Sequence, residues 1–314
     1  MSAAADPAAG AAPDPAVDAA PDPAVDAAAG AATGAAPGAC PVCGTSVFAG
    51  DLYCERCGHT LGSPVCASCG AAAVDAEGYC ERCGLRQPTG RDHAEIVLEG
   101  GAAAVTDKGL RRSRNEDAVA LLGAGPAVVS VVCDGVGSSP RADEASAVAV
   151  EAASAALIRG LSHEEAFELA GRAVAKLATS VHDAPACTYV AAVVRGGRVS
   201  LAWAGDTRAY WLPAAPPRTP DLLTTDDVVE TGEITAWLGA DAEDVRLHVR
   251  DFVPPAPGLL LVCSDGLWRY LDGHAVPASG DPLELARELL RHALDSGGQD
   301  NITIALIPLG DARE

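Results

Sequence analysis

Four Cys-x-x-Cys pairs lie between residues 40 and 83, and they constrain the fold of this segment more than any other feature of the chain. Two pairs separated by ten residues recur 26 residues downstream, so the segment is an internal duplication. Two such pairs on facing turns supply four thiolates in a tetrahedron around zinc, and a closed four-ligand site is structural. We therefore predict two zinc ribbons over residues 40–88, with two structural Zn²⁺ ions held by Cys40, Cys43, Cys54, Cys57, Cys66, Cys69, Cys80 and Cys83.

Disulfides in a secreted domain, or an iron site of the same geometry, are the alternatives for these cysteines. No basic segment followed by an apolar run stands at the N-terminus, and no stretch approaches the roughly 20 apolar residues that span a bilayer. Both observations favour a cytoplasmic protein, in which thiols stay reduced and bind metal. The other cysteines lie in apolar runs and are predicted to be buried thiols: Cys133, Cys187 and Cys263.

Composition separates an extended tail from the rest of the chain. Residues 1–39 contain no aromatic residue, no Lys and no Arg, so we expect a disordered Ala-, Pro- and Asp-rich tail. The formal net charge is −21, which argues against binding to nucleic acid or to an anionic membrane surface. The chain has 20 Arg and only 2 Lys in an Ala-rich composition, which is typical of a GC-rich bacterial genome.

Residues 89–314 have the pattern of one globular domain that mixes strands and helices. Short Val-rich runs bounded by Gly, Asp or Pro predict strands at 96–105, 118–122, 127–133, 188–194, 199–203, 208–212, 259–263 and 302–307. Longer stretches predict helices at 141–159, 163–181 and 282–292. Ser162 and Asp281 are the predicted N-caps of the last two. This order of elements predicts an α+β domain.

Four separated motifs place an Asp beside Gly, Asn or another acidic residue near the end of an apolar run. They are RRSRNED at 111–117, VVCDGVGS at 131–138, LVCSDGLW at 261–268 and GGQDNIT at 297–303. Carboxylates at strand ends can converge at one edge of a sheet, where their oxygens suit Mg²⁺ or Mn²⁺. Each motif alone is better explained by a turn, so the prediction of a shared metal site depends on all four. The chain's two Asn residues, Asn115 and Asn301, both fall inside these motifs.

The four motifs, together with AGDTRAY at 204–210, occur in the order found in the type 2C (PPM) serine/threonine phosphatases. Residues 94–308 resemble that family, above all its compact bacterial members. The resemblance implies a four-layer α-β-β-α sandwich with a binuclear Mn²⁺ or Mg²⁺ centre at one end. It implies that Asp134 bridges the two ions and that the Gly135 carbonyl binds one of them. Asp265 and Asp300 would bind the other ion, with Asp117 near the centre, mainly through water.

The resemblance also implies roles for residues beside these carboxylates. Arg112 matches the family's phosphate-binding arginine, and the alternative for it is a surface salt bridge. Asp206 matches a ligand of a possible third metal. Arg269 stands where the partner carboxylate of that site would be, and a cation there disfavours the third ion. The alternative for Asp206 is an ion pair with Arg208.

These features together predict a protein-serine/threonine phosphatase that hydrolyses phosphoserine and phosphothreonine with a water activated by two Mn²⁺ or Mg²⁺ ions. Its substrates would be proteins phosphorylated by bacterial serine/threonine kinases, and the zinc ribbons would bind a partner that the sequence does not identify. One alternative is a weakly active or inactive phosphatase-like adaptor or phospho-sensor that acts through its ribbons. Another is a nuclease or other metal-dependent phosphohydrolase, against which the acidic surface counts.

Overall fold

The computed structural model describes residues 38–39, 44–47, 56, 66, 69–71, 73–74, 79–84, 91–180, 183–215, 220–242, 244–271, 276 and 279–310. The chain divides into two compact units, Met1–Val65 and Cys66–Glu314. In the first unit, β1 (Gly38–Ala39) pairs antiparallel with β2 (Ser46–Val47). Most of the predicted tail and the first set of cysteines lie outside the described residues, namely residues 1–37, Cys40, Cys43, Cys54 and Cys57.

The second unit is built on two antiparallel sheets, with the strand orders β11-β10-β14-β15-β4-β3 and β13-β9-β8-β6-β5. The first sheet consists of β3 (His93–Val97), β4 (Ala103–Asp107), β10 (Arg208–Pro213), β11 (Asp221–Leu222), β14 (Gly258–Cys263) and β15 (Ile302–Leu309). The second consists of β5 (Ala118–Ala124), β6 (Ala127–Cys133), β8 (Tyr189–Arg195), β9 (Arg198–Ala204) and β13 (His248–Phe252).

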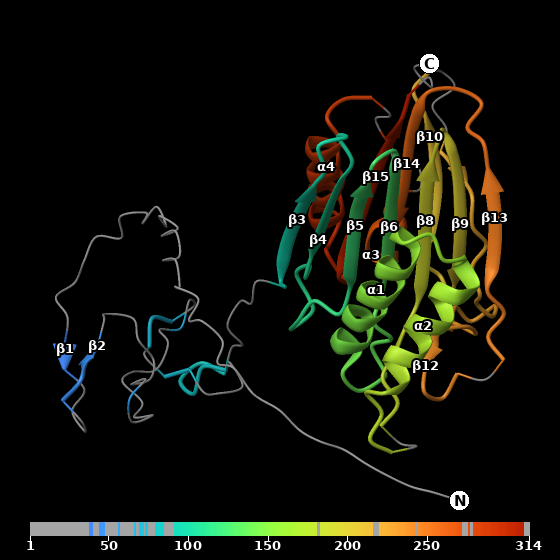
Figure 1. Ribbon diagram of the computed structural model, residues 1–314. Coiled ribbons are helices and arrows are strands. Elements are labelled where there is room, and N and C mark those ends of the chain that lie inside the picture. The colour runs from blue at the N-terminus through green and yellow to red at the C-terminus, as the bar shows by residue number, and fades with distance from the viewer. Residues whose placement is uncertain are drawn as a thin grey trace, which may run out of the picture. The chain divides into compact units, whose positions relative to one another are not determined.

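Helices cover the outer face of each sheet, which gives four layers (Figure 1). The helices α1 (Ala142–Ile158) and α2 (His163–Ala175) pack on the second sheet, and α4 (Pro282–Asp295) packs on the first. A separate apolar cluster between the sheets is centred on large side chains such as Trp211 and Leu201. The mixed α+β architecture predicted from the sequence is confirmed.

The predicted strand at 96–105 is wrong, because the structure has a hairpin there. Strands β3 and β4 pair antiparallel, and the amide of Leu98 donates to the carbonyl of Ala102 over 2.9 Å. Gly101 takes a φ of 85° in this turn, which a residue without Cβ adopts at no steric cost. Glu99, Gly100 and Gly101 interrupt the apolar run at this turn, and the prediction of one continuous strand overlooked that Gly-Gly signal.

Helix α2 begins where predicted but ends at Ala175 instead of residue 181. A capping box fixes its start, since the Ser162 hydroxyl accepts from the amide of Glu165 and the Glu165 carboxylate accepts from the amide of Ser162. Beyond its end, the Asp183 carboxylate accepts from the Thr179 amide and binds Arg141, which favours a loop over further helix. Among the described residues, no helix combines the length and the apolar character needed to cross a bilayer.

Candidate metal centre

The Asp-bearing motifs lie at the ends of elements drawn from both sheets. Asp117 directly precedes β5 and Asp134 directly follows β6, whereas Asp265 opens the single turn α3 (Asp265–Trp268) after β14 and Asp300 lies just before β15. Asp134 follows a strand of one sheet and Asp265 follows a strand of the other, and the two carboxyl groups lie close enough to affect each other's pKa. Burial, together with the charges of Asp117, Asp265, Asp206 and Asp300, raises the pKa of Asp134 well above its usual range. The structure thus brings these carboxylates together at one end of the sandwich.

Hydrogen bonds on both sides fix the backbone that carries Asp134. Its amide donates to the Thr188 hydroxyl over 3.0 Å, and its carbonyl accepts from the Thr188 amide over 2.8 Å. The next amide, that of Gly135, donates to the Glu116 carbonyl over 3.1 Å. A Cβ at Gly135 would lie only 2.8 Å from the carbonyl oxygens of Glu116 and Ala142, so only glycine fits this close approach.

Asp117 is the most deeply buried of these carboxylates, with 3% of its surface exposed. Its Oδ2 accepts a hydrogen bond of 2.6 Å from the Ser264 hydroxyl, whereas its buried Oδ1 has no hydrogen-bond partner. Burial raises the pKa of Asp117 to about 7, with the charges of Asp265 and Asp300 adding to the effect and the Ser264 hydrogen bond opposing it. The motif SDG contained this serine, but its contact with Asp117 was not predicted.

Two arginines form ion pairs with two different carboxylates of the cluster. Arg112 Nη2 lies 2.7 Å from Asp300 Oδ2, and Arg269 Nη2 lies 2.6 Å from Asp265 Oδ2. The other Asp265 oxygen, Oδ1, is buried without a hydrogen-bond partner. Burial raises the pKa of Asp265, and the Arg269 charge opposes that shift. The predicted phosphate-binding arginine is therefore at the cluster, and a second arginine accompanies it.

Asp206 is close to the cluster but does not pair with Arg208. The Arg208 guanidinium binds both carboxylate oxygens of Asp226, with its Nη2 2.6 Å from Oδ2 and its Nε 2.9 Å from Oδ1. The Asp206–Arg208 alternative is therefore wrong, because Asp226 meets the guanidinium in a bidentate geometry. Burial, with the charges of Asp265 and Asp226, raises the pKa of Asp206 to about 6.

The chain's two Asn residues hold the backbone around the carboxylates instead of lining the site. Both are buried, Asn115 being 3% exposed and Asn301 being 2% exposed. Asn301 Nδ2 donates to the carbonyls of Lys108 and Arg114 over 2.8 and 2.9 Å, and its Oδ1 accepts from the Glu116 amide over 2.8 Å. One amide thereby fixes the loop that carries Arg112 and Asp117 against the start of β15.

A family model described as Protein phosphatase 2C matches residues 110–301, which contain all of these carboxylates. This chain belongs to the protein phosphatase 2C family. Among curated relatives, the serine/threonine protein phosphatase PstP of Mycobacterium tuberculosis is 28% identical over 262 residues, covering 69% of this chain and 46% of PstP. The serine/threonine phosphatase stp of Listeria innocua is 28% identical over 234 residues, covering 64% of this chain and 93% of stp. The match thus spans about half the length of PstP.

Solved structures agree with this membership of the protein phosphatase 2C family. The catalytic domain of PstP in complex with two manganese ions superposes with a TM-score of 0.54 at 25% identity, covering 69% of this chain and all of that one. The phosphatase MsPP of Mycobacterium smegmatis, in complex with cacodylate, gives a TM-score of 0.53 at 27% identity, covering 68% of this chain and 99% of that one.

The donor set of this protein phosphatase 2C domain fits divalent cations. The clustered oxygens belong to carboxylates, which are hard ligands suited to Mn²⁺ and Mg²⁺. Two of them, Asp117 Oδ1 and Asp265 Oδ1, are buried without a hydrogen-bond partner, which is costly unless a cation or water binds there. The raised pKa values of Asp117, Asp134 and Asp206 have the same cause, since negative charges are held close together away from water.

The metal-free protein is expected to lose stability as the pH rises from about 4 to about 8. Asp117 has a pKa of about 7 in the folded chain against an ordinary value of 3.8, so the folded state binds more protons than the unfolded state in this window. The contribution of Asp117 is complete below the unfolded pKa and is lost as the pH passes the folded pKa. Melting in EDTA at pH 5.5 and pH 8 measures this, and Asp117→Asn should flatten the difference. A metal-free protein that melts higher at pH 8 would contradict the expectation.

The described cysteines of the second predicted ribbon also converge. The Sγ atoms of Cys66, Cys69, Cys80 and Cys83 all lie within 4.8 Å of one another. The amide of Cys69 donates to the Cys66 sulfur over 3.5 Å, as expected where a knuckle backbone turns toward its thiolates. Four sulfurs at this spacing suit a tetrahedral metal site.

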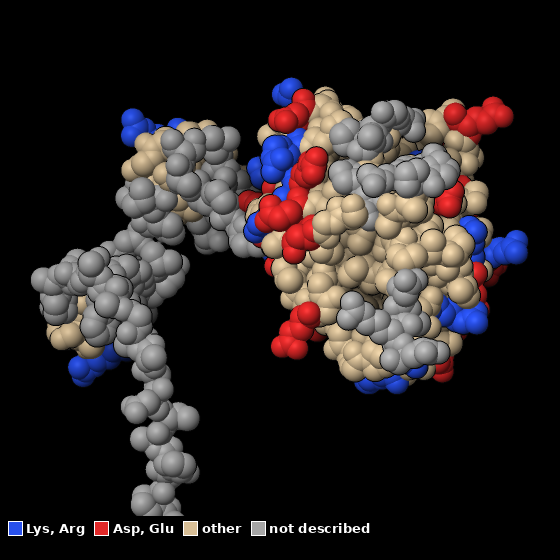
Figure 2. Space-filling view, turned by 90° about the horizontal axis from the view of Figure 1, so that it is seen from above, with Lys and Arg blue, Asp and Glu red and all other residues tan. Residues whose placement is uncertain are grey.

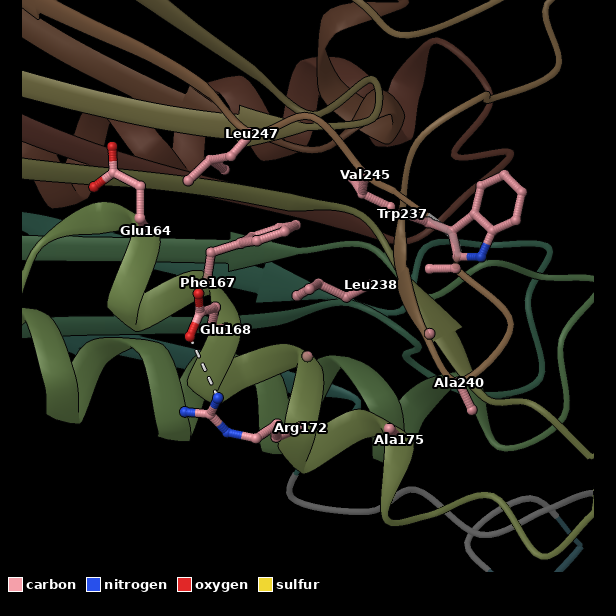
Figure 3. Close-up of a pocket in the computed structure, with 13 residues that line it drawn as sticks. Glu164, Phe167, Glu168, Arg172, Ala175, Trp237, Leu238, Ala240, Val245 and Leu247 are labelled. Carbon is pink, nitrogen blue, oxygen red and sulfur yellow. Dashed lines mark hydrogen bonds and ion pairs between the residues drawn. The ribbon is translucent and has the colours of Figure 1, made fainter.

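The large cavity between α2 and residues 237–247 is a different kind of site from the carboxylate cluster. Its volume is about 570 Å³, and Phe167, Leu238 and Leu247 point into it (Figure 3). The charged side chains that line it are Glu164, Glu168 and Arg172, and the last two form an ion pair. None of the Asp residues discussed above lines this cavity, so it is separate from the carboxylate cluster.

The end of the sandwich seen in Figure 2, which is opposite to the carboxylate cluster, carries mixed charges. Lys and Arg side chains lie among Asp and Glu side chains there, around a largely uncharged surface (Figure 2). No extended basic patch appears on the described part of this face. Such a surface has no concentrated positive charge for a polyanionic ligand.

Proposed function

We propose that this chain is a metal-dependent protein-serine/threonine phosphatase whose carboxylate cluster holds two Mn²⁺ or Mg²⁺ ions. One observation carries the proposal: carboxylates from both sheets meet in one cluster, and two of their buried oxygens lack a partner. Membership of the protein phosphatase 2C family supports it, as does the crystal structure of the PstP catalytic domain in complex with two manganese ions. Phosphoserine and phosphothreonine in proteins are the proposed substrates.

The proposed ligands are the groups that the sequence resemblance singled out. Asp134 would be shared by both ions, the Gly135 carbonyl would bind one, and Asp265 and Asp300 would bind the other. Asp117 would act beside them through water. A third ion near Asp206 is not proposed, because the Arg269 guanidinium is ion-paired with Asp265 close by and its charge also acts on Asp206.

Bound divalent ions would supply Lewis acidity and would lower the pKa of water. The chain's own groups then have separate tasks. Arg112, whose guanidinium is 39% exposed, would hold phosphoryl oxygens bidentately. Asp117 Oδ1, buried and without a protein partner, would accept a hydrogen bond from the attacking water. The attacking water gives one proton to solvent and its oxygen forms a bond to phosphorus. The bond between phosphorus and the serine or threonine oxygen breaks, and the alkoxide takes a proton from solvent.

A covalent phospho-enzyme is not part of the proposal. The thiols nearest in sequence to the cluster, Cys133 and Cys263, are fully buried, and burial raises the pKa of both. Thiols of this kind are poor nucleophiles, because the thiolate is the reactive form. Direct attack by water is therefore the proposed route.

Turnover of a phosphothreonine peptide by the purified full-length chain with Mn²⁺ tests the proposal. We expect release of inorganic phosphate that falls by at least about 100-fold with EDTA and recovers when Mn²⁺ is restored. A phosphotyrosine peptide serves as the specificity control. A folded, metal-loaded chain that releases no phosphate from phosphoserine or phosphothreonine peptides would refute the activity and favour the adaptor alternative.

For the cysteines, we propose that Cys66, Cys69, Cys80 and Cys83 hold one structural Zn²⁺ and that the duplicated upstream set holds a second. The convergence of four sulfurs in the second set supports this. The ribbons are proposed to bind a protein partner, and the substrates are proposed to be proteins phosphorylated by bacterial serine/threonine kinases.

Replacing Cys80 by Ser is expected to lower bound zinc from about two ions to about one per chain, because a closed tetrahedral site loses one of its four ligands. Metal analysis of the purified protein by mass spectrometry measures this. Cys263→Ala, which removes a thiol from the core of the main domain, should leave the zinc content unchanged. Unaltered zinc in the Cys80 variant would contradict the assignment.

A further inference from the structure

The two arginines at the carboxylate cluster are arranged alike. Arg112 pairs with Asp300 and Arg269 pairs with Asp265, at 2.7 and 2.6 Å. Both guanidinium side chains are substantially exposed, at 39% and 54%, whereas their carboxylate partners are only 19% and 10% exposed. The charges of both arginines act on the Asp265 carboxyl group. Two cations thus stand on the solvent side of one cluster of acids.

Metal binding at the cluster would take the carboxylate partner from each arginine. A divalent ion that binds Asp265 or Asp300 neutralises the carboxylate charge that now holds the guanidinium, and it repels the guanidinium directly. A guanidinium displaced in this way becomes available to bind another anion close by. The dianionic phosphoryl group of a substrate has the oxygen geometry that an arginine fork binds best.

The neighbours of Arg269 fix its position but leave its guanidinium available. Arg269 follows Trp268, whose indole Nε1 donates to the Asp206 carbonyl over 2.8 Å, so the turn is anchored beside the cluster. The guanidinium carbons of Arg208 and Arg269 lie 3.5 and 5.7 Å from the centre of the Trp268 ring, and Arg208 is held by a bidentate ion pair with Asp226. Asp265 is the carboxylate that the structure records in an ion pair with Arg269.

We propose that Arg269 is a second phosphate-binding residue, which leaves Asp265 when the cluster binds metal and joins Arg112 on the phosphoryl oxygens of the substrate. This inference rests on the proposed phosphatase function. It assigns Arg269, which lies just after the Ser-Asp-Gly motif, to substrate binding. In the metal-loaded site, the guanidinium groups of Arg112 and Arg269 would then both bind the phosphoryl group.

The test compares Arg269→Gln and Arg269→Lys with the wild-type full-length protein. Arg172→Gln is the matched control, because Arg172 forms an i,i+4 ion pair on a helix as Arg269 does, but with Glu168 on α2. Calorimetry measures the affinity of the Mn²⁺-loaded protein for inorganic phosphate and of the metal-free protein for Mn²⁺, and steady-state kinetics on a phosphothreonine peptide gives KM and kcat. Melting curves confirm that each variant is folded.

We expect Arg269→Gln to weaken phosphate binding and raise KM by about 10-fold each, because a charge-assisted bidentate contact is lost. Arg269→Lys should lose less phosphate affinity and raise KM less, because lysine keeps the positive charge but lacks the planar guanidinium group. Phosphate affinity and KM within about 2-fold of wild type, with only Mn²⁺ bound more tightly, would show that Arg269 merely competes with metal and would overturn the inference. A wild-type protein without turnover would refute the proposed function instead, while phosphate titration would still report on Arg269.

Discussion

Replacing Asp134 by Asn is expected to lower kcat for a phosphothreonine peptide by about 1000-fold, equivalent to about 4 kcal/mol of activation free energy. Asp134 is the proposed shared ligand, and a neutral amide binds two divalent ions far less well than a carboxylate. The same change should leave the metal-free protein as stable as wild type or more stable. In that form Asp134 is an acid whose pKa is raised by burial and by the charges of Asp117 and Asp265.

Kinetics at saturating Mn²⁺, calorimetric Mn²⁺ titration and melting in EDTA separate these two effects. Asp251→Asn is the control, because Asp251 is an exposed residue of the edge strand β13. It should change neither turnover nor Mn²⁺ affinity. An Asp134 variant that keeps wild-type kcat would contradict the proposed centre, and one that melts well below wild type without metal would contradict the electrostatic explanation.

Replacing Asn301 by Ala is expected to lower the free energy of unfolding by about 4 kcal/mol. The change removes three hydrogen bonds and leaves the carbonyls of Lys108 and Arg114 and the amide of Glu116 without their partner in a closely packed region. The loop that carries Arg112 should also loosen, so KM should rise in the fraction that stays folded. Urea unfolding of the metal-free protein measures the change in the free energy of unfolding.

Gln299→Ala provides the comparison for Asn301, since Gln299 is exposed and lies two residues away. Its unfolding free energy should stay within about 0.5 kcal/mol of wild type. If Asn301→Ala proved equally mild, the buried amide would not be what holds the loop against the start of β15.

The sequence allowed the architecture and the identity of the clustered acids to be predicted, because both depend on local patterns. Asp-Gly after an apolar run marked the strand ends before Asp134 and Asp265, and Asp300-Asn301 marked the start of the apolar run of β15. The hairpin between β3 and β4 was missed because the apolar runs on either side of Glu99, Gly100 and Gly101 were joined into one strand, although Gly-Gly is a turn signal. Strand β13 was missed because HVRDF is a polar edge strand with little hydrophobic pattern.

Some contacts of the centre were harder to predict, such as the ion pair of Arg112 with Asp300, because they join residues far apart in the chain. The pairing of Arg208 with Asp226 depends on how the loop after β11 returns to β10. The hydrogen bond from Ser264 to Asp117 joins segments 147 residues apart. The sequence shows that these residues are polar, but the tertiary structure determines which of several nearby acids each of them contacts.

The acids of the cluster come from both sheets, with Asp117 and Asp134 on one and Asp265 and Asp300 on the other. Ions bound by all four would act as a cross-link between the two sheets at one end of the sandwich. Sheet docking and metal affinity are then linked quantities, since whatever binds only the docked state also stabilises it. A core substitution that weakens the docking of the sheets, far from any ligand, would therefore weaken metal binding.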